Sequence, residues 1–337
     1  MKVMKFGGTS VGTPERMKSV ATMVSESGEQ VFVVLSAMSG TTNSLIEISN
    51  YLYKKNSDGA NDVINNLEQK YMQHVEELYS TDEYKQRTRE FLASEFNYLR
   101  SFTKDLFTSF EEKNIVAQGE IISTNMVTNF LQEQGVKVCL LSAFDFMRTD
   151  KNAEPDTHYI KEKLATLMKE NEGYQIYITQ GFICRNAYGE VDNLLRGGSD
   201  FTASLIGAAL PAEEIQIWTD IDGMHNNDPR VVEKTEAIRQ LNFEKLPSLL
   251  TSAQRFCTLL ACSRLSSLAY QYASRTLSTR RQRALSSTTC CSKAKLRLLQ
   301  LRITSRLSRS NRRACSLLRV SSAKCSRYSS ATRLLSI

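Results

Sequence analysis

The C-terminal part of this 337-residue sequence lacks four common residue types. All 36 Asp and Glu, all 15 Gly and all three His precede Lys245, and residues 245–337 contain none of them. That tail carries 19 Lys and Arg, which gives it a formal charge of +19 against −12 for residues 1–244. At the acid frequency of the first part the tail would hold about 14 acidic residues, so chance does not explain their absence.

Two interpretations of the tail remain. It is a basic arm for nucleic acid or acidic lipid, or it is read in a shifted frame. Read in the alternative frame, the codons for 245–261 can encode EAAELAYFGAKILHPT, which restores Glu, Gly and His. We therefore predict two segments, an ordered domain 1–244 and an out-of-frame tail 245–337. Aromatic residues for base stacking are few in the tail, so no specific nucleic-acid partner is expected.

Other absences restrict location and chemistry. The first eight residues have no apolar secretory core, and no apolar run approaches the roughly 20 residues that span a bilayer. Cys139 and Cys184, the two cysteines before the tail, have no metal-ligand spacing. These features predict a reduced, cytoplasmic protein with no membrane partner, and no residue is assigned as a metal ligand.

Short apolar runs alternate with helical patterns in the first part. A run buried on both faces is typical of a parallel strand, and strands that alternate with helices predict a doubly wound sheet. The expected α/β fold is a mostly parallel sheet flanked by helices, with its site beyond the carboxyl ends of the strands. Strands are predicted at Lys2–Phe6, Val31–Leu35, 137–141, 174–179 and 215–218.

Helix signals fill the intervals. Thr13 and Pro14 form a good N-cap and first-turn pair, and a second helix is predicted at 43–52. Residues 61–110 have long helical spacing, which predicts an inserted antiparallel helical pair. Its core faces are predicted to comprise Tyr71, Val75 and Leu78, followed by Phe96, Leu99, Phe102 and Leu106.

The loops after the predicted strands carry polar motifs. Lys5-Phe6-Gly7-Gly8-Thr9-Ser10 offers backbone N–H groups and a lysine charge for a phosphate, although a tight strand–helix turn would look similar. Residues 35–43, LSAMSGTTN, are rich in hydroxyl groups that suit a polar ligand. Thr42 or Asn43 could equally cap a helix.

Four more motifs have both a functional and a structural interpretation. Arg196 in RGGSD provides a fork for a carboxylate or phosphate, while Ser199 and Asp200 could be N-cap residues. Gly119-Glu120 opens a predicted helix at 121–131, where the helix dipole would favour a carboxylate. WTD ends the strand at 215–218, and NDPR at 227–230 would form a turn whatever the function.

Together these motifs are specific. The sequence contains KFGGTSV, LSAMSGTTN, QGE, TQGF, RGGSDFTA and WTDIDGMHNNDPR in this order. It resembles the aspartokinases of the amino-acid kinase family over nearly all of residues 1–244. The frame-restored FGAKILHPT is similar to the next kinase motif of that family, and GKIKAVAAKDNITAIKIK, read from a later part of the tail, to its ACT module. The kinase domain is therefore expected to be incomplete at its C-terminal end.

The resemblance implies a role for each motif residue. ATP with Mg²⁺ and L-aspartate are the expected cofactor and substrate, and the intact family member is expected to be a homodimer. His225 stands where the family often has a tyrosine beside the nucleotide. The implied catalytic residues are Lys5 and Asp200; those for the nucleotide are Gly7, Gly8, Ser10, Thr219, Asp220, His225 and Arg230; those for the substrate are Ser36, Thr42, Glu120, Arg196 and Ser199.

The expected reaction is transfer of the ATP γ-phosphoryl group to the side-chain carboxylate of aspartate, the first step of lysine, threonine and methionine biosynthesis. A carboxylate is already ionised near neutral pH, so no general base is required. The tail replaces the last kinase elements and the ACT modules, which predicts impaired activity. Two alternatives are another amino-acid kinase, acting on glutamate, carbamate or a nucleotide, and a basic-tailed nucleic-acid-binding protein.

Overall fold

The computed structural model divides into two compact units, Met1–Ile303 and Thr304–Ile337, and every residue described below belongs to the first. Side chains and backbone are described for residues 1–104, 106–194, 198–210 and 212–219 and for positions 232, 234 and 236, and backbone alone for 272–276. The predicted boundary at Glu244 therefore lies outside the described residues. Of the tail, only the backbone of residues 272–276 is described.

A parallel six-stranded sheet forms the centre of this unit. Its order is β3-β4-β2-β1-β7-β8, and every neighbouring pair is parallel. The predicted strands are all confirmed, with ends shifted by at most a few residues, whereas β8 was not predicted. The strands are β1 (Lys2–Phe6), β2 (Val31–Leu35), β3 (Val138–Leu140), β4 (Ile176–Gln180), β7 (Glu214–Thr219) and β8 (Tyr272–Thr276).

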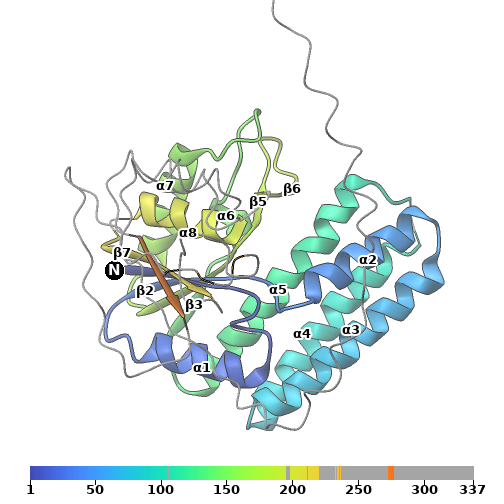
Figure 1. Ribbon diagram of the computed structural model, residues 1–337, viewed down its shortest axis with the longest axis horizontal. Helices are drawn as coiled ribbons and strands as arrows, with labels where there is room; N and C mark the ends of the chain where they lie inside the picture. Colours follow the sequence, from blue (N-terminus) through green and yellow to red (C-terminus); the bar gives the residue numbers. More distant parts are fainter. Residues whose placement is uncertain are drawn as a thin grey trace, which may run out of the picture. The chain divides into compact units, whose positions relative to one another are not determined.

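Helices cover both faces of the sheet (Figure 1). Alternate side chains of each strand enter separate cores: Met4 and Phe6 pack with α1 (Pro14–Ser25) and α5 (Ser109–Glu133). Val3 and Val34 pack on the other face with α6 (Ala143–Phe146), α7 (Thr157–Glu170) and α8 (Gly198–Ala209). Lys5 shares the side of β1 that Val3 occupies, so its side chain extends toward α8.

A helical insertion packs beside α5. It comprises α2 (Thr41–Tyr53), α3 (Ser57–Leu78) and α4 (Asp82–Ser101), and Figure 1 shows all three on the side of α5 away from the sheet. Tyr71 and Phe96 are fully buried between α3 and α4, which confirms the predicted pair. Leu106 is 88% exposed, so its assignment to the core face was wrong. The helical period stops at Ser101, before Leu106 is reached.

Helix α5 begins much earlier than the sequence predicted. Thr108 caps it at Ser109, and the Glu111 carboxylate accepts the Thr108 N–H at 2.9 Å to complete a capping box. The predicted start at Gly119 was wrong, because the first turns of α5 are polar and carry no apolar stripe. Glu120 therefore lies inside the helix, and a helix-dipole contact does not explain its presence.

A small hairpin extends from the end of β4. Strands β5 (Ile183–Arg185) and β6 (Val191–Asn193) pair in an antiparallel sheet of their own. Across the described ranges, no helix is both long enough and apolar enough to cross a membrane.

Candidate active site

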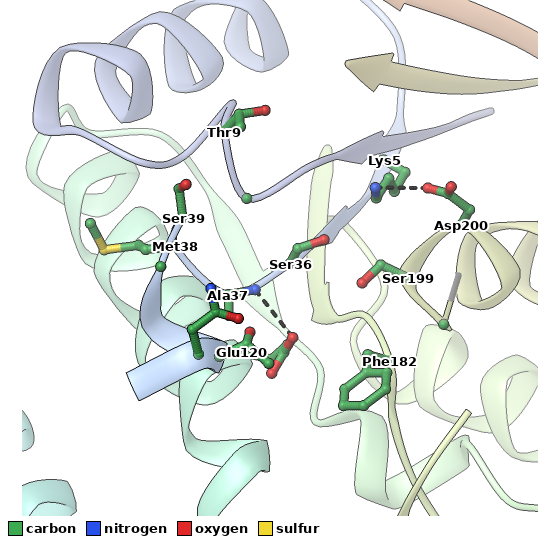
Figure 2. Close-up of a pocket in the computed structure, with 15 residues that line it drawn as sticks. Lys5, Thr9, Ser36, Ala37, Met38, Ser39, Glu120, Phe182, Ser199 and Asp200 are labelled. Atoms are coloured by element: carbon green, nitrogen blue, oxygen red, sulfur yellow. Dashed lines mark hydrogen bonds and ion pairs between the residues drawn. The ribbon is translucent and has the colours of Figure 1, made fainter. Parts of the chain in front are cut away.

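A cavity of about 540 Å³ opens at the carboxyl ends of β1, β2 and β4 (Figure 2). This is the edge of the sheet at which parallel α/β folds hold ligands. The wall contains seven of the residues predicted from sequence together with eight others that were not assigned. It is lined by Lys5, Gly8, Thr9, Ser36, Ala37, Met38, Ser39, Gly40, Thr42, Asn43, Glu120, Phe182, Gly198, Ser199 and Asp200.

Lys5 and Asp200 form an ion pair across this cavity. The Lys5 Nζ lies 2.7 Å from the Asp200 Oδ1, and the two side chains are 12% and 22% exposed (Figure 2). Lys5 belongs to β1 and Asp200 to the first turn of α8, so two elements far apart in sequence meet here. A lysine charge beside a helix N-terminus favours an anion at this position.

The loop after β1 approaches the loop after β2 very closely. The Ser39 N–H donates to the Gly8 carbonyl oxygen at 3.1 Å, and the Ser10 N–H donates to that of Gly7 at 2.9 Å. A methyl carbon added at Gly8 would lie 2.6 Å from the Ala37 carbonyl oxygen. Glycine is therefore required at position 8 for space against the β2–α2 loop, and the approach of this backbone to a ligand stays a prediction. Gly7 and Ser10 do not line the cavity; Ser10 is buried beneath the loop.

This geometry separates the two glycines experimentally. Gly8→Ala is expected to lower the free energy of unfolding by about 1–3 kcal/mol, because backbone rather than a mobile side chain blocks the methyl group. In Gly7→Ala the nearest atoms would be 3.6 and 3.8 Å away, so a change within about 0.5 kcal/mol is expected. Urea denaturation of both variants measures the difference. Equal losses would show that the Gly8 contact is not tight.

Glu120 is the most strongly perturbed carboxyl group in the cavity. Its side chain is 4% exposed, and one oxygen accepts the Ala37 N–H at 3.3 Å. Its Oε2 is buried and makes no hydrogen bond with any described residue. Burial raises the pKa of Glu120 to about 8, and the Ala37 N–H opposes this shift only in part. A cation that enters beside this carboxylate would favour its ionised form.

Hydroxyl groups of the β2–α2 loop and of the first turn of α2 complete that side of the cavity. Ser36 and Thr42 both line it, as the sequence predicted. Ser123 of α5 donates to the Ser36 carbonyl oxygen at 2.8 Å, which fixes the loop against the helix that carries Glu120. The alternative that Thr42 or Asn43 caps a helix is wrong for α2, because Gly40 occupies the N-cap with φ of 87° and no side-chain cap bond.

Phe182 and the start of α8 form the opposite wall. Phe182 has a φ of 69°, which is uncommon for a large residue, and its N–H donates to Thr202 Oγ1 at 3.0 Å. A methyl carbon at Gly198 would lie 2.5 Å from the Phe182 ring. Since α8 starts at Gly198, Ser199 and Asp200 lie within its first turn, and the N-cap interpretation was wrong. Phe182 was missed; the motif TQGF at a strand end was the only signal.

The remaining assignments stay predictions. Thr219 ends β7 but does not line the cavity. Arg196, Asp220, His225 and Arg230 lie outside the described residues. Within the described ranges, no three His, Cys, Asp or Glu side chains are grouped as a metal site would need.

Comparison with known proteins places this architecture in a family. A sequence profile described as "Amino acid kinase family" matches residues 1–258. The chain belongs to the amino acid kinase family. This assignment confirms the predicted fold, and the match passes the predicted boundary at Glu244.

Curated family members give the same result in more detail. The chain is similar to lysine-sensitive aspartokinase 3 of Escherichia coli, with 32% identity over 254 residues, which are 74% of this chain and 55% of that protein. An aspartokinase of Chlamydia trachomatis is 30% identical over 258 residues, 75% of this chain and 56% of the relative. The chain thus spans about half the length of these relatives.

Solved structures support the fold. E. coli aspartokinase III in complex with aspartate and ADP superposes with a TM-score of 0.73 at 24% identity, covering 89% of this chain and 65% of that one. The same enzyme with lysine and aspartate gives a TM-score of 0.62 at 28% identity, covering 78% and 60%.

Proposed function

We propose that this chain is an aspartate kinase sequence, which transfers the γ-phosphoryl group of ATP to the side-chain carboxylate of L-aspartate. The observation that carries the proposal is the single cavity in which Lys5, the start of α8 and the buried Glu120 face one another. Lys5 and the N-terminus of α8 suit a phosphoryl group, and the Glu120 carboxylate suits an ammonium group. The similarity to aspartokinases then specifies the substrate among family members.

The phosphate side of the cavity fits a nucleoside triphosphate. Gly8 lets main-chain N–H groups approach a phosphate, and Lys5 supplies a positive charge beside them. Asp200 is a suitable carboxylate for Mg²⁺, which typically binds through one or two carboxylates and the substrate phosphates. When bound, Mg²⁺ would neutralise part of the phosphate charge. We assign Gly7 and Ser10 to shaping this loop, and Thr219, Asp220, His225 and Arg230 to the nucleotide.

The aspartate side follows from Glu120. In the proposed complex its carboxylate accepts the substrate ammonium group, and Arg196 pairs with the α-carboxylate. Ser36, Thr42 and Ser199 line the same cavity and hydrogen-bond the remaining oxygens. These contacts hold the side-chain carboxylate in line with the phosphoryl group. Because that carboxylate is already an anion, the protein needs only to position it and to neutralise charge with Lys5.

The predicted impairment is tested together with the activity. Acyl phosphate formed from ATP and L-aspartate is trapped with hydroxylamine and measured for this chain and for one whose frame is restored after Glu244. We expect turnover in the restored chain and little or none in this one, because we infer that residues 245–337 do not form the terminal kinase elements. Equal turnover would contradict the impairment. Acceptance of glutamate, carbamate or a nucleotide instead of aspartate would support the alternative kinase.

A further inference from the structure

A second cavity, of about 440 Å³, lies away from the proposed active site. Its walls come from α4, α5, α6 and the β5–β6 hairpin, and it shares no lining residue with the first cavity. Its volume falls in the range of roughly 300–1,000 Å³ that small-molecule pockets occupy. Its charged side chains are those of Glu95 and Arg185, and Ser94, Asn114, Gln118 and the Tyr98 hydroxyl add neutral polar groups.

Glu95 is a carboxylate without a described partner. It lies on α4, is partly buried, and forms neither a hydrogen bond nor an ion pair with any residue that the structure describes. Burial alone raises its pKa above the ordinary value. An ionised carboxylate in this position lacks a counter-charge, and an incoming cation would supply one.

Arg185 provides the opposite charge from the hairpin. Its Nη1 donates to the Gly189 carbonyl oxygen at 2.6 Å and its Nε to that of Phe144 at 3.3 Å. These neutral acceptors hold the guanidinium in place without cancelling its charge. The neighbouring Lys113 and Asp192 pair with each other at 2.8 Å, and no described carboxylate forms an ion pair with Arg185.

Gln118 gives an independent indication of a ligand. Its side chain is 5% exposed, and the buried Oε1 has no hydrogen-bond partner among the described residues. A buried amide oxygen without a partner is unfavourable, so a donor that enters beside it would be favoured. Tyr98, Phe144 and Val191 supply apolar and aromatic surface in the same cavity, and the Arg185 guanidinium lies over the Phe144 ring at 5.2 Å.

From these contacts we propose that the second cavity binds a zwitterionic α-amino acid with an apolar side chain. Its ammonium group lies against Glu95 and Gln118, its carboxylate against Arg185, and its side chain against Tyr98, Phe144 and Val191. The proposal does not depend on the kinase activity, because none of these binding groups lines the first cavity. Gln118 lies two residues before Glu120 on α5, so a ligand in the second cavity contacts the helix that carries the active-site carboxylate.

Binding to the full chain by isothermal titration calorimetry tests the proposal. L-leucine is expected to bind saturably, with a Kd on the order of 1 mM or tighter. N-acetyl-L-leucine lacks the ammonium group and L-leucinamide lacks the carboxylate, so each is expected to bind about tenfold more weakly, the effect of one charge-assisted contact. No saturable binding of L-leucine, or equal binding of all three, would overturn the proposal.

Variants then identify the cavity. Glu95→Gln is expected to weaken L-leucine binding about tenfold and to remove the preference for L-leucine over N-acetyl-L-leucine. Glu90→Gln, an exposed change on the same helix, is expected to leave both affinities unchanged. Glu120→Gln is also expected to leave them unchanged, which separates this cavity from the proposed aspartate site. If Glu120→Gln reduces L-leucine binding and Glu95→Gln does not, the ligand occupies the first cavity and the proposal is wrong. Should Glu95→Gln fail to fold, Glu120→Gln still decides, because L-leucine binding that this variant weakens belongs to the first cavity and would overturn the proposal.

Discussion

Lys5→Met, in a chain whose frame is restored after Glu244, is expected to lower kcat/KM for aspartate phosphorylation by roughly 10³-fold. Methionine has a similar length but no charge, so the change removes the cation that faces Asp200 across the cavity. The loss should fall mainly on kcat, because charge neutralisation matters most while the phosphoryl group is transferred. Steady-state assays with ATP and aspartate separate kcat from KM.

Lys2→Met is the matched control for Lys5→Met. Lys2 lies on the same strand, but its ammonium group pairs with Glu29 at the surface, far from the carboxyl end of β1. Its replacement is expected to change kcat by less than twofold, since surface ion pairs contribute roughly 0–1 kcal/mol. If the two lysine variants lose activity equally, Lys5 acts through folding and not through the reacting phosphoryl group.

Glu120→Gln is expected to raise the KM for aspartate by roughly 10²-fold in the same restored chain, because a charge-assisted hydrogen bond to the substrate ammonium becomes a neutral one. Glutamine has nearly the same shape, so the buried helix position stays filled. The KM for ATP is expected to change little, since the proposed phosphate contacts lie on the other side of the cavity. An equal rise in both constants would contradict the assignment of Glu120 to the ammonium group.

The pH dependence of aspartate binding provides a second test of Glu120. Its pKa is raised to about 8, so only about 3% of the free protein holds it ionised near pH 6.5. Only the ionised form attracts the ammonium group, and the KM for aspartate should therefore fall by about 30-fold between roughly pH 6.5 and 9. Glu120→Gln is expected to abolish this dependence. A fall of the same size in the variant would assign the titration to another group.

The free energy of unfolding should also depend on Glu120, but it should decrease with rising pH while aspartate binding improves. Below its ordinary value of 4.5 the carboxyl of Glu120 is protonated in folded and unfolded chains alike. Between about 4.5 and 8 the folded chain retains a proton that the unfolded chain has lost, so the contribution of Glu120 to stability decreases as pH rises through this window.

The strands, and the place of several candidate residues in one cavity wall, were predictable because their signals are local. Val31–Leu35 is apolar on both faces, and all five of its residues are buried in the parallel sheet. Lys5 and Ser36 flank strand ends, and parallel strands bring such ends to one edge. Thr13 caps α1 as predicted, because an N-cap bond requires only residues within one turn.

Other features depend on contacts that a single sequence does not display. The first turns of α5 are polar, so the start of this helix gave no apolar periodicity. The left-handed backbone of Phe182 is maintained by Thr202 and by the packing of Gly198, residues about twenty positions away. Glu95 and Arg185, which form no ion pair with a described residue, come from α4 and the hairpin, and only the fold reveals that they line the same cavity.

Every described residue that lines the proposed active-site cavity lies at or before Asp200. During translation, these walls are synthesised before the 93-residue basic segment. At about 5–20 residues per second, that segment takes several seconds to add, which is long compared with the folding time of many small domains. The described walls of the cavity therefore have time to assemble before the chain is complete. Strand β8, which comes from this later segment, is then added at the edge of the same sheet.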